Sequence, residues 1–245
     1  MSAHFDAAET RASDSREGAL FARLPETLAR AKAYAPAWAE RLADIDPAAV
    51  TSREALATLP VLRKADLSDA QAAKPPFGGF LAVPAAKLSR VFLSPGPVAV
   101  PQGPESDPWH CARALFAAGV RPGDTVVNTF GYHITPGAFI LESGLAALQC
   151  PVFAAGPGSA GEMVHSIAAL RPKVYCGVPD YLNILLEKAE ETGVDLGFEK
   201  ALVSGAALPP DLRAHIEARG VRVTQCYATA DLGVIAYESE AREGL

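Results

Sequence analysis

The sequence predicts an α/β fold, with a mostly parallel sheet, helices on both faces and a helical N-terminal region before it. From Leu88 onward, short β-like runs alternate with helical segments, which implies crossover connections between parallel strands. Before that point the chain is alanine-rich and its apolar residues recur at helical spacing. With 245 residues, of which 49% are hydrophobic, the chain can bury a substantial core.

The N-terminal region is expected to contain several short helices. Apolar residues follow a helical period over residues 20–42, but Pro25 and Pro36 interrupt it, so we expect two or three short helices there. Thr51 or Ser52, with Glu54 close behind, forms a capping pattern before another helix, and residues 66–73 predict one more. A Pro- and Gly-rich loop at 74–79 then suggests a boundary, which gives residues 1–85 as the helical region and 86–245 as the α/β subdomain.

The C-terminal region is expected to form the sheet and its covering helices. The expected strands are 90–93, 125–129, 152–154, 174–176, 201–203 and 221–224. The expected helices are 108–118, 138–148, 161–170, 179–192 and 209–219. Because ligands bind at the carboxyl ends of parallel strands, the loops that follow these strands are where a site should lie.

Composition excludes some classes of function. The chain has 22 basic and 28 acidic side chains, a net charge of −6 and no polybasic block, which argues against binding nucleic acid or an anionic membrane surface. The four cysteines are widely spaced without a CxxC pair, so we expect reduced thiols. His110 beside Cys111 leaves a zinc site as a minor alternative. With no signal peptide or membrane-spanning run, we expect a soluble cytoplasmic protein.

Three of the loops allow both a functional and a structural interpretation. Ser94-Pro95-Gly96-Pro97 could present backbone amides to phosphate, but each proline removes a donor, so on its own the loop favours a rigid turn. Tyr132 and His133 could line an acyl pocket or simply pack under a helix. The small residues Ser204-Gly205-Ala206 would let a flat ring approach the backbone, or they form a tight turn for packing alone.

The stretch from Tyr227 to Asp231 is the most distinctive. An aromatic ring, the Thr229 hydroxyl and a carboxylate lie within five residues, after a β-like run. A Tyr face can stack on a purine, a hydroxyl can bind phosphate, and an Asp can hold a divalent metal ion. The alternative is a polar surface turn in which Asp231 caps a helix.

Taken in order, these segments resemble the N-terminal portion of the phenylacetate–CoA ligase-like branch of the adenylate-forming superfamily. The matching pieces are 59–67, 117–124, 128–133, 176–181, 203–206 and 227–231. The resemblance implies that ATP and a small aromatic carboxylic acid form an acyl-adenylate and pyrophosphate, after which coenzyme A accepts the acyl group. ATP, Mg²⁺ and coenzyme A are the implied cofactors and co-substrates.

The resemblance also implies a role for each loop. The phosphate-binding loop would include Ser94 and Gly96, and the adenine-contacting turn Ser204, Gly205 and Ala206. In the last motif Tyr227 would stack on adenine, Ala228 and Thr229 would line the nucleotide site, and Thr229 and Asp231 would serve catalysis, with Asp231 holding Mg²⁺. The acyl pocket would be lined by Tyr132, His133, Gly177, Val178 and Pro179.

This sequence departs from the family pattern at two loops. The phosphate loop lacks the usual Lys and two amide donors, which should weaken its hold on the β- and γ-phosphates. In the last motif Ala228 replaces Gly, Thr229 comes one position early, and Asp231 replaces Glu. Family members continue beyond Leu245 with a hinge and a catalytic C-terminal domain, so we expect an N-terminal part that does not complete thioester formation alone.

Other hypotheses remain open at this stage. A non-catalytic module that binds a nucleotide or a partner subunit would also explain the altered phosphate loop. A homodimer and a separate C-terminal subunit are both compatible with the sequence. A dinucleotide enzyme is disfavoured because no G-x-G-x-x-G pattern follows any expected strand.

Overall fold

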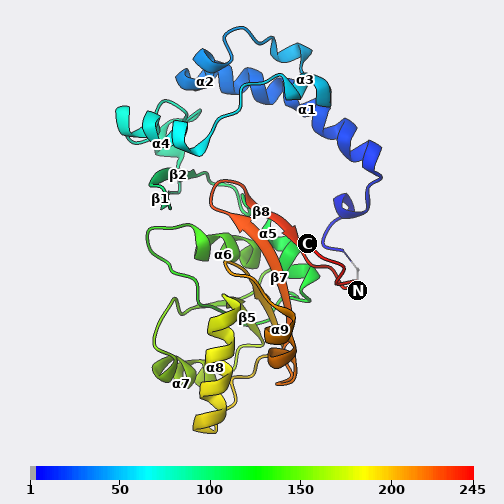
Figure 1. Ribbon diagram of the computed structural model, residues 1–245, viewed down its shortest axis with the longest axis vertical. Coiled ribbons are helices and arrows are strands. Elements are labelled where there is room, and N and C mark those ends of the chain that lie inside the picture. The colour runs from blue at the N-terminus through cyan, green and yellow to red at the C-terminus, as the bar shows by residue number, and fades with distance from the viewer. Residues whose placement is uncertain (1–3) are drawn as a thin grey trace. The chain divides into compact units, whose positions relative to one another are not determined.

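A computed structural model describes residues 4–245 and divides the chain into two compact units (Figure 1). One unit is Asp6–Pro104; the other contains Glu105–Leu245 together with His4 and Phe5. The predicted α/β class, with a helical N-terminal region, is confirmed. The division expected between residues 85 and 86 precedes the boundary between the units, because β2 (Val98–Gln102), which pairs with β1 (Arg90–Ser94), packs on helix α4 (Lys64–Ala73).

The first unit consists of helices followed by a β-hairpin. Its elements are η1 (Ala7–Thr10), α1 (Ser13–Tyr34), α2 (Pro36–Arg41), η2 (Pro47–Ala49), α3 (Arg53–Ala57), α4, η3 (Ala85–Lys87), β1 (Arg90–Ser94) and β2 (Val98–Gln102). Strands β1 and β2 pair antiparallel in a sheet of their own. Ser52 caps α3 as expected, since its hydroxyl accepts from the Ala55 amide at 3.3 Å.

The expected break at Pro25 was wrong. Helix α1 continues through Pro25 for 22 residues. Although proline removes one helical hydrogen bond, α1 packs along α2 and η2, and Lys32 Nζ donates to the carbonyls of Ala43 and Ile45 at 2.9 Å each. These contacts offset the lost bond. Pro36 does end the helix, and it occupies the first position of α2, where a missing amide costs little.

The second unit is a doubly wound sheet. Its elements are α5 (Cys111–Ala117), β3 (Val126–Asn128), α6 (Gly137–Ala147), β4 (Val152–Ala154), α7 (Ala160–Leu170), β5 (Val174–Gly177), α8 (Pro179–Thr192), β6 (Lys200–Val203), α9 (Pro210–Glu217), β7 (Arg222–Thr229) and β8 (Gly233–Tyr237). The strand order is β4-β3-β5-β6-β7-β8, and only the last pair is antiparallel among the described residues. Every strand and helix predicted here corresponds to an observed element.

Side chains alternate between the two faces of this sheet. Val127, Tyr175, Ala201 and Val223 pair with one another across neighbouring strands and join one core cluster with residues of α7, α8 and α9. The next row, which includes buried Cys176, points to the opposite face. That face is covered by α5 and α6, which pack against each other closely enough that a Cβ on Gly144 would lie 2.7 Å from Cys111.

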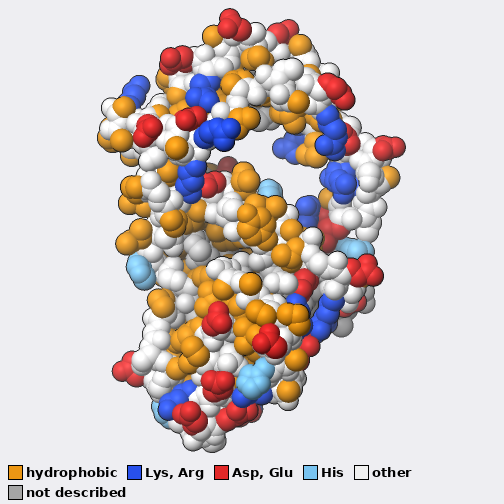
Figure 2. All heavy atoms as spheres, in the orientation of Figure 1, with side chains coloured by type: hydrophobic (Ala, Val, Ile, Leu, Met, Phe, Trp, Pro, Cys, Tyr) orange, Lys and Arg blue, Asp and Glu red, His pale blue; other side chains and the backbone are white. Residues whose placement is uncertain are grey.

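All four cysteines are buried and free, as expected. No three His, Cys, Asp or Glu side chains in residues 4–245 are grouped to hold a metal ion, so nothing supports zinc at His110 and Cys111. Acidic and basic side chains are interspersed on the face shown in Figure 2. No helix within the described part of the chain has both the length and the apolar character to cross a bilayer.

Candidate functional site

The direction of winding reverses at β3, so the carboxyl ends of β3 and β5 form the topological switch point of the sheet. The connection through α6 leads to β4 on one side of β3, and α7 then returns to β5 on its other side. Ligands bind at such switch points in open α/β sheets. The predicted residues Gly177, Val178 and Pro179 lie here, at the end of β5 and the start of α8.

A buried tyrosine joins the two strand ends at this switch point. The Tyr175 hydroxyl lies 3.0 Å from Thr129 Oγ1 and 3.0 Å from the Val178 carbonyl oxygen, so it joins the ends of β3 and β5. Burial raises the pKa of Tyr175 above its ordinary value of 10, which keeps the hydroxyl neutral. A Cβ on Gly177 would lie 2.1 Å from both hydroxyl oxygens, so only glycine fits at this position.

Three residues from three strand ends form an apolar wall. A Cβ built on Gly205 would lie 3.4 Å from Phe130 Cε1 and 3.4 Å from Val178 Cγ1. Gly205 has a φ of +80°, and the backbone of Gly205 and Ala206 is exposed beside this wall. Ser204 itself is buried, and its hydroxyl donates to the Cys226 carbonyl at 2.8 Å. The turn therefore presents backbone and an apolar surface rather than the serine side chain.

Tyr227, Ala228 and Thr229 lie in a strand, where the sequence predicted a loop beginning at Gln225. Strand β7 continues to Thr229 and turns into β8, and the pairing shifts register between Tyr227 and Ala228. The turn is closed by the Leu232 amide, which donates to Thr229 Oγ1 at 3.2 Å. The Tyr227 side chain is 53% exposed, and Asp231 is exposed in the turn. Asp231 therefore caps no helix.

The β7–β8 hairpin is attached to the segment before α5. The Val234 amide donates to the Trp109 carbonyl at 3.0 Å, and Trp109 is buried. A Cβ on Gly233 would lie 2.6 Å from Trp109, and Gly233 has a φ of +77°. Glycine is therefore required for the hairpin to approach Trp109 this closely.

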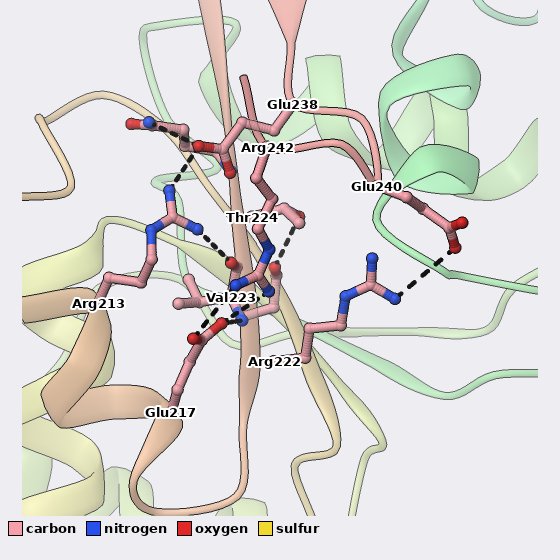
Figure 3. A network of polar contacts seen from close by, with 10 residues as sticks. Arg213, Glu217, Arg222, Val223, Thr224, Glu238, Glu240 and Arg242 are labelled. Carbon is pink, nitrogen blue, oxygen red and sulfur yellow. Dashed lines mark hydrogen bonds and ion pairs between the residues drawn. The ribbon is translucent and has the colours of Figure 1, made fainter. Parts of the chain in front are cut away.

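A polar network fixes the other end of the hairpin (Figure 3). Glu238, directly after β8, is 5% exposed and accepts hydrogen bonds from the Gln225 amide at 3.1 Å and Gln225 Nε2 at 3.0 Å. It also pairs with Arg213 of α9, whose Nη1 donates to the Val223 carbonyl at 2.8 Å. Glu217 pairs with Arg242 at 2.8 Å. These contacts hold the strand that carries Tyr227 and Thr229.

In the loop after β3, Tyr132 packs against a neighbouring ring, whereas His133 is exposed. Tyr132 packs edge-on against Phe139, with ring centroids 5.4 Å apart, and its hydroxyl accepts from Asn128 Nδ2 at 3.1 Å. Burial and the Glu142 carboxylate raise the pKa of Tyr132 above 10, so it remains protonated. His133 is exposed, and its ring lies against Gly131, 3.2 Å from the position that a Cβ would take there.

Ser94 and Gly96 lie in the other compact unit, in the turn between β1 and β2. Ser94 is buried, and its hydroxyl donates to the Val98 carbonyl at 3.3 Å. Gly96 is exposed, with a φ of +133°. Between Pro95 and Pro97, Gly96 carries the one backbone amide of this three-residue turn.

Sequence reasoning missed two residues that shape the site. Phe130 directly follows the predicted strand 125–129, so its place at the strand end was a usable signal. Glu238 carried no such signal, because its role depends on the pairing of β7 with β8 and on Arg213 in α9.

The chain is similar to known ligases over most of its length. No protein-family model matches the chain. It is 31% identical to a phenylacetate–coenzyme A ligase of Thermus thermophilus, over 82% of this chain and 47% of the relative. It is 28% identical to the Pseudomonas putida ligase of the same name, over 98% of this chain and 57% of the relative. The chain thus spans about half the length of the curated relatives it matches.

Solved structures include a close match in fold. An open conformation of a 2-hydroxyisobutyryl-CoA ligase, in complex with 2-HIB-AMP and CoA, superposes with a TM-score of 0.84 and 26% identity, over 91% of this chain and 52% of that one. Its postadenylation state, in complex with 2-HIB-AMP, gives a TM-score of 0.83. The resemblance to the phenylacetate–CoA ligase-like branch of the adenylate-forming superfamily is confirmed.

Proposed function

We propose that this chain is the N-terminal, nucleotide- and acyl-binding part of an AMP-forming acid–CoA ligase for a small aromatic carboxylic acid. The observation that carries the proposal is the apolar wall at the switch point, where Phe130 and Val178 lie beside the exposed Gly205. A flat ring fits against such a wall, and backbone groups can read its edge. Matching ligases in three bacteria, one of them Aromatoleum evansii, support the same assignment.

In this proposal the adenine ring stacks on Tyr227 and lies along Gly205 and Ala206. Ser204 holds β6 against β7 through the Cys226 carbonyl, which keeps the turn beside the strand that carries Tyr227. Ala228 and Thr229 line the nucleotide site, and Ser94 and Gly96 bind the terminal phosphates. The acyl group contacts Gly177, Val178 and Pro179 after β5 and Tyr132 and His133 after β3.

Asp231 is the residue that would hold Mg²⁺. Mg²⁺ is commonly bound through one or two carboxylates together with substrate phosphates, and an exposed Asp in the hairpin turn fits that donor set. When bound, Mg²⁺ neutralises charge on the phosphates. The chain's own contribution is to hold this carboxylate two residues from the Thr229 hydroxyl, with the turn closed by the Leu232 amide.

We assign thioester formation with coenzyme A to the assembled protein. Because this chain spans about half of its relatives, the rest of the machinery would come from a C-terminal part in the same polypeptide or in a separate subunit. A homodimer is a further possible assembly. We infer a cytoplasmic location, where ATP and coenzyme A are available.

One observation favours a second candidate, a non-catalytic nucleotide-binding module. The turn at Ser94 to Pro97 has lost two amide donors to proline, and donors of this kind hold the phosphates during catalysis. Such a module would bind nucleotide without turnover.

Two measurements separate these candidates. Pyrophosphate exchange into ATP that depends on phenylacetate or a similar acid supports the ligase, and calorimetry measures nucleotide binding. Tyr227→Ala should lower affinity for ATP and AMP about tenfold, given the usual contribution of base stacking. Tyr34→Ala is the matched control, since Tyr34 is 67% exposed on α1. Binding without exchange supports the second candidate, and neither binding nor exchange with any acid refutes both.

A further inference from the structure

The turn between β1 and β2 lies next to a lysine from another element. A Cβ built on Gly96 would lie 3.5 Å from Lys64 Cε, and the Lys64 ammonium is one bond further on. Lys64 is the first residue of α4, far from Gly96 in sequence, and it is exposed. The turn itself contains no lysine.

Helix α4 is fixed against the hairpin along one stripe. Ser68 Oγ donates to the Gly96 carbonyl at 3.3 Å. One turn further along, the buried Gln71 accepts from the Ala99 amide at 2.6 Å and donates to the Ala99 carbonyl at 3.1 Å. Lys64, Ser68 and Gln71 follow at intervals of four and three, so they lie on the same face of the helix. The docking that positions Ser68 and Gln71 therefore brings Lys64 to the turn.

Asp66, in the first turn of α4, has partners of its own. Asp66 accepts from the Arg63 amide at 3.4 Å and lies 3.8 Å from Arg41, so its carboxylate is directed to these groups. Gly96, which lies between two prolines, supplies the single backbone amide of the turn. An anion bound at the turn would therefore have this amide and the nearby Lys64 ammonium as donors.

We propose that Lys64 supplies the cation for the β- and γ-phosphates of ATP at the Ser94–Gly96 turn, in place of a lysine within the turn. The inference rests on the proposed function, since it assigns a residue to the same phosphate site. A lysine ammonium binds phosphate as a point charge, which needs proximity rather than a fixed fork geometry. A flexible side chain at the end of a fixed helix meets that requirement.

The test compares ATP, AMP and inorganic tripolyphosphate as probes, with calorimetry on the full 245-residue chain. Lys64→Met should weaken ATP and tripolyphosphate binding about tenfold to a hundredfold, as expected for a charge-assisted hydrogen bond, and leave AMP within about twofold. Lys64→Arg should restore most of the loss. Lys74→Met, at the other end of α4, is the matched control and should change none of the three.

The outcomes distinguish this inference from the function on which it rests. If Lys64→Met leaves ATP and tripolyphosphate binding at the wild-type level, the assignment of Lys64 is refuted and the proposed function stands. If AMP binding falls as much as ATP binding, the residue acts on folding and the assignment is also refuted. If the wild-type chain binds neither ATP nor AMP, the proposed function and the assignment fall together. Circular dichroism of each variant checks that α4 is retained.

Discussion

Replacing Glu238 should destabilise the second unit more than any other single charge substitution near the hairpin. Its carboxylate is 5% exposed and meets three donors: Arg213, the Gln225 amide and Gln225 Nε2. In Glu238→Gln, the new amide group would face donors where the carboxylate now accepts. In Glu238→Ala, Arg213 would keep its charge at a side-chain exposure of 18% with no counter-ion.

The magnitude follows from this burial. Removing one partner of a buried ion pair costs about 3–5 kcal/mol, and the partial exposure of Arg213 places Glu238→Ala near the lower end, at about 3 kcal/mol. Glu238→Gln retains an acceptor for Arg213, so we expect about 2 kcal/mol. For a unit of this size, 3 kcal/mol corresponds to a fall in Tm of about 10 °C.

Urea denaturation followed by tryptophan fluorescence measures the effect. Trp109 contacts the hairpin and is buried, whereas Trp38 lies in the first unit, so a Trp38→Phe background isolates the signal. Glu240→Gln is the control, because Glu240 is 86% exposed and 4.0 Å from Arg222, and it should change the free energy of unfolding by less than about 0.5 kcal/mol. Equal effects at Glu238 and Glu240 would refute the reasoning.

Three further predictions concern the same unit. Gly177→Ala should lower the free energy of unfolding by about 3 kcal/mol, because the new methyl group would overpack the ends of β3 and β5. Gly161→Ala is the control and should cost none, since its Cβ would meet nothing within 4 Å. Equal effects of the two substitutions in urea denaturation would contradict the packing around Gly177. At Asp124, burial alone would raise the pKa, but the hydrogen bond from Lys200 and the Arg121 amide lower it below 3.8. The ionised carboxylate therefore stabilises the fold above about pH 4, so Asp124→Asn should lower the free energy of unfolding by about 1–3 kcal/mol at pH 7. In an acid titration the difference between the variant and the wild type should shrink below about pH 4. A difference that stays constant with pH would contradict this. The four buried thiols, with the pKa of Cys226 raised to about 11, should not react with a thiol reagent at pH 8 until denaturant is added; rapid labelling of the native chain would contradict their burial.

Much of the sheet could be predicted because its elements are locally encoded. Runs of apolar β-branched residues bounded by Gly and Pro mark the strands, and Pro179 marks the start of α8 at the residue observed. The loops after the strands also indicated Gly177 and Gly205 before their packing was known. These features depend on neighbours within a few residues.

The rest depends on contacts between distant segments. The extension of β7 through Thr229 requires β8 as a partner and Glu238 to fix its end, and neither is visible in the local pattern. The continuity of α1 through Pro25 likewise depends on packing against other helices. The proximity of Lys64 to Gly96 requires the docking of α4 on β2. Tertiary contacts override local preference in each case.

The bond between Val234 and Trp109 also has a consequence for folding. It joins the last strand of the second unit to the segment before its first helix, so the unit is closed by a contact between its two ends. Long-range closure of this kind slows folding, because chain entropy is lost before the contact forms. During synthesis, α5 would emerge long before β8, and its surface toward the hairpin would stay uncovered until Val234 follows. The hairpin that carries Tyr227 and Thr229 thus also covers α5 late in synthesis.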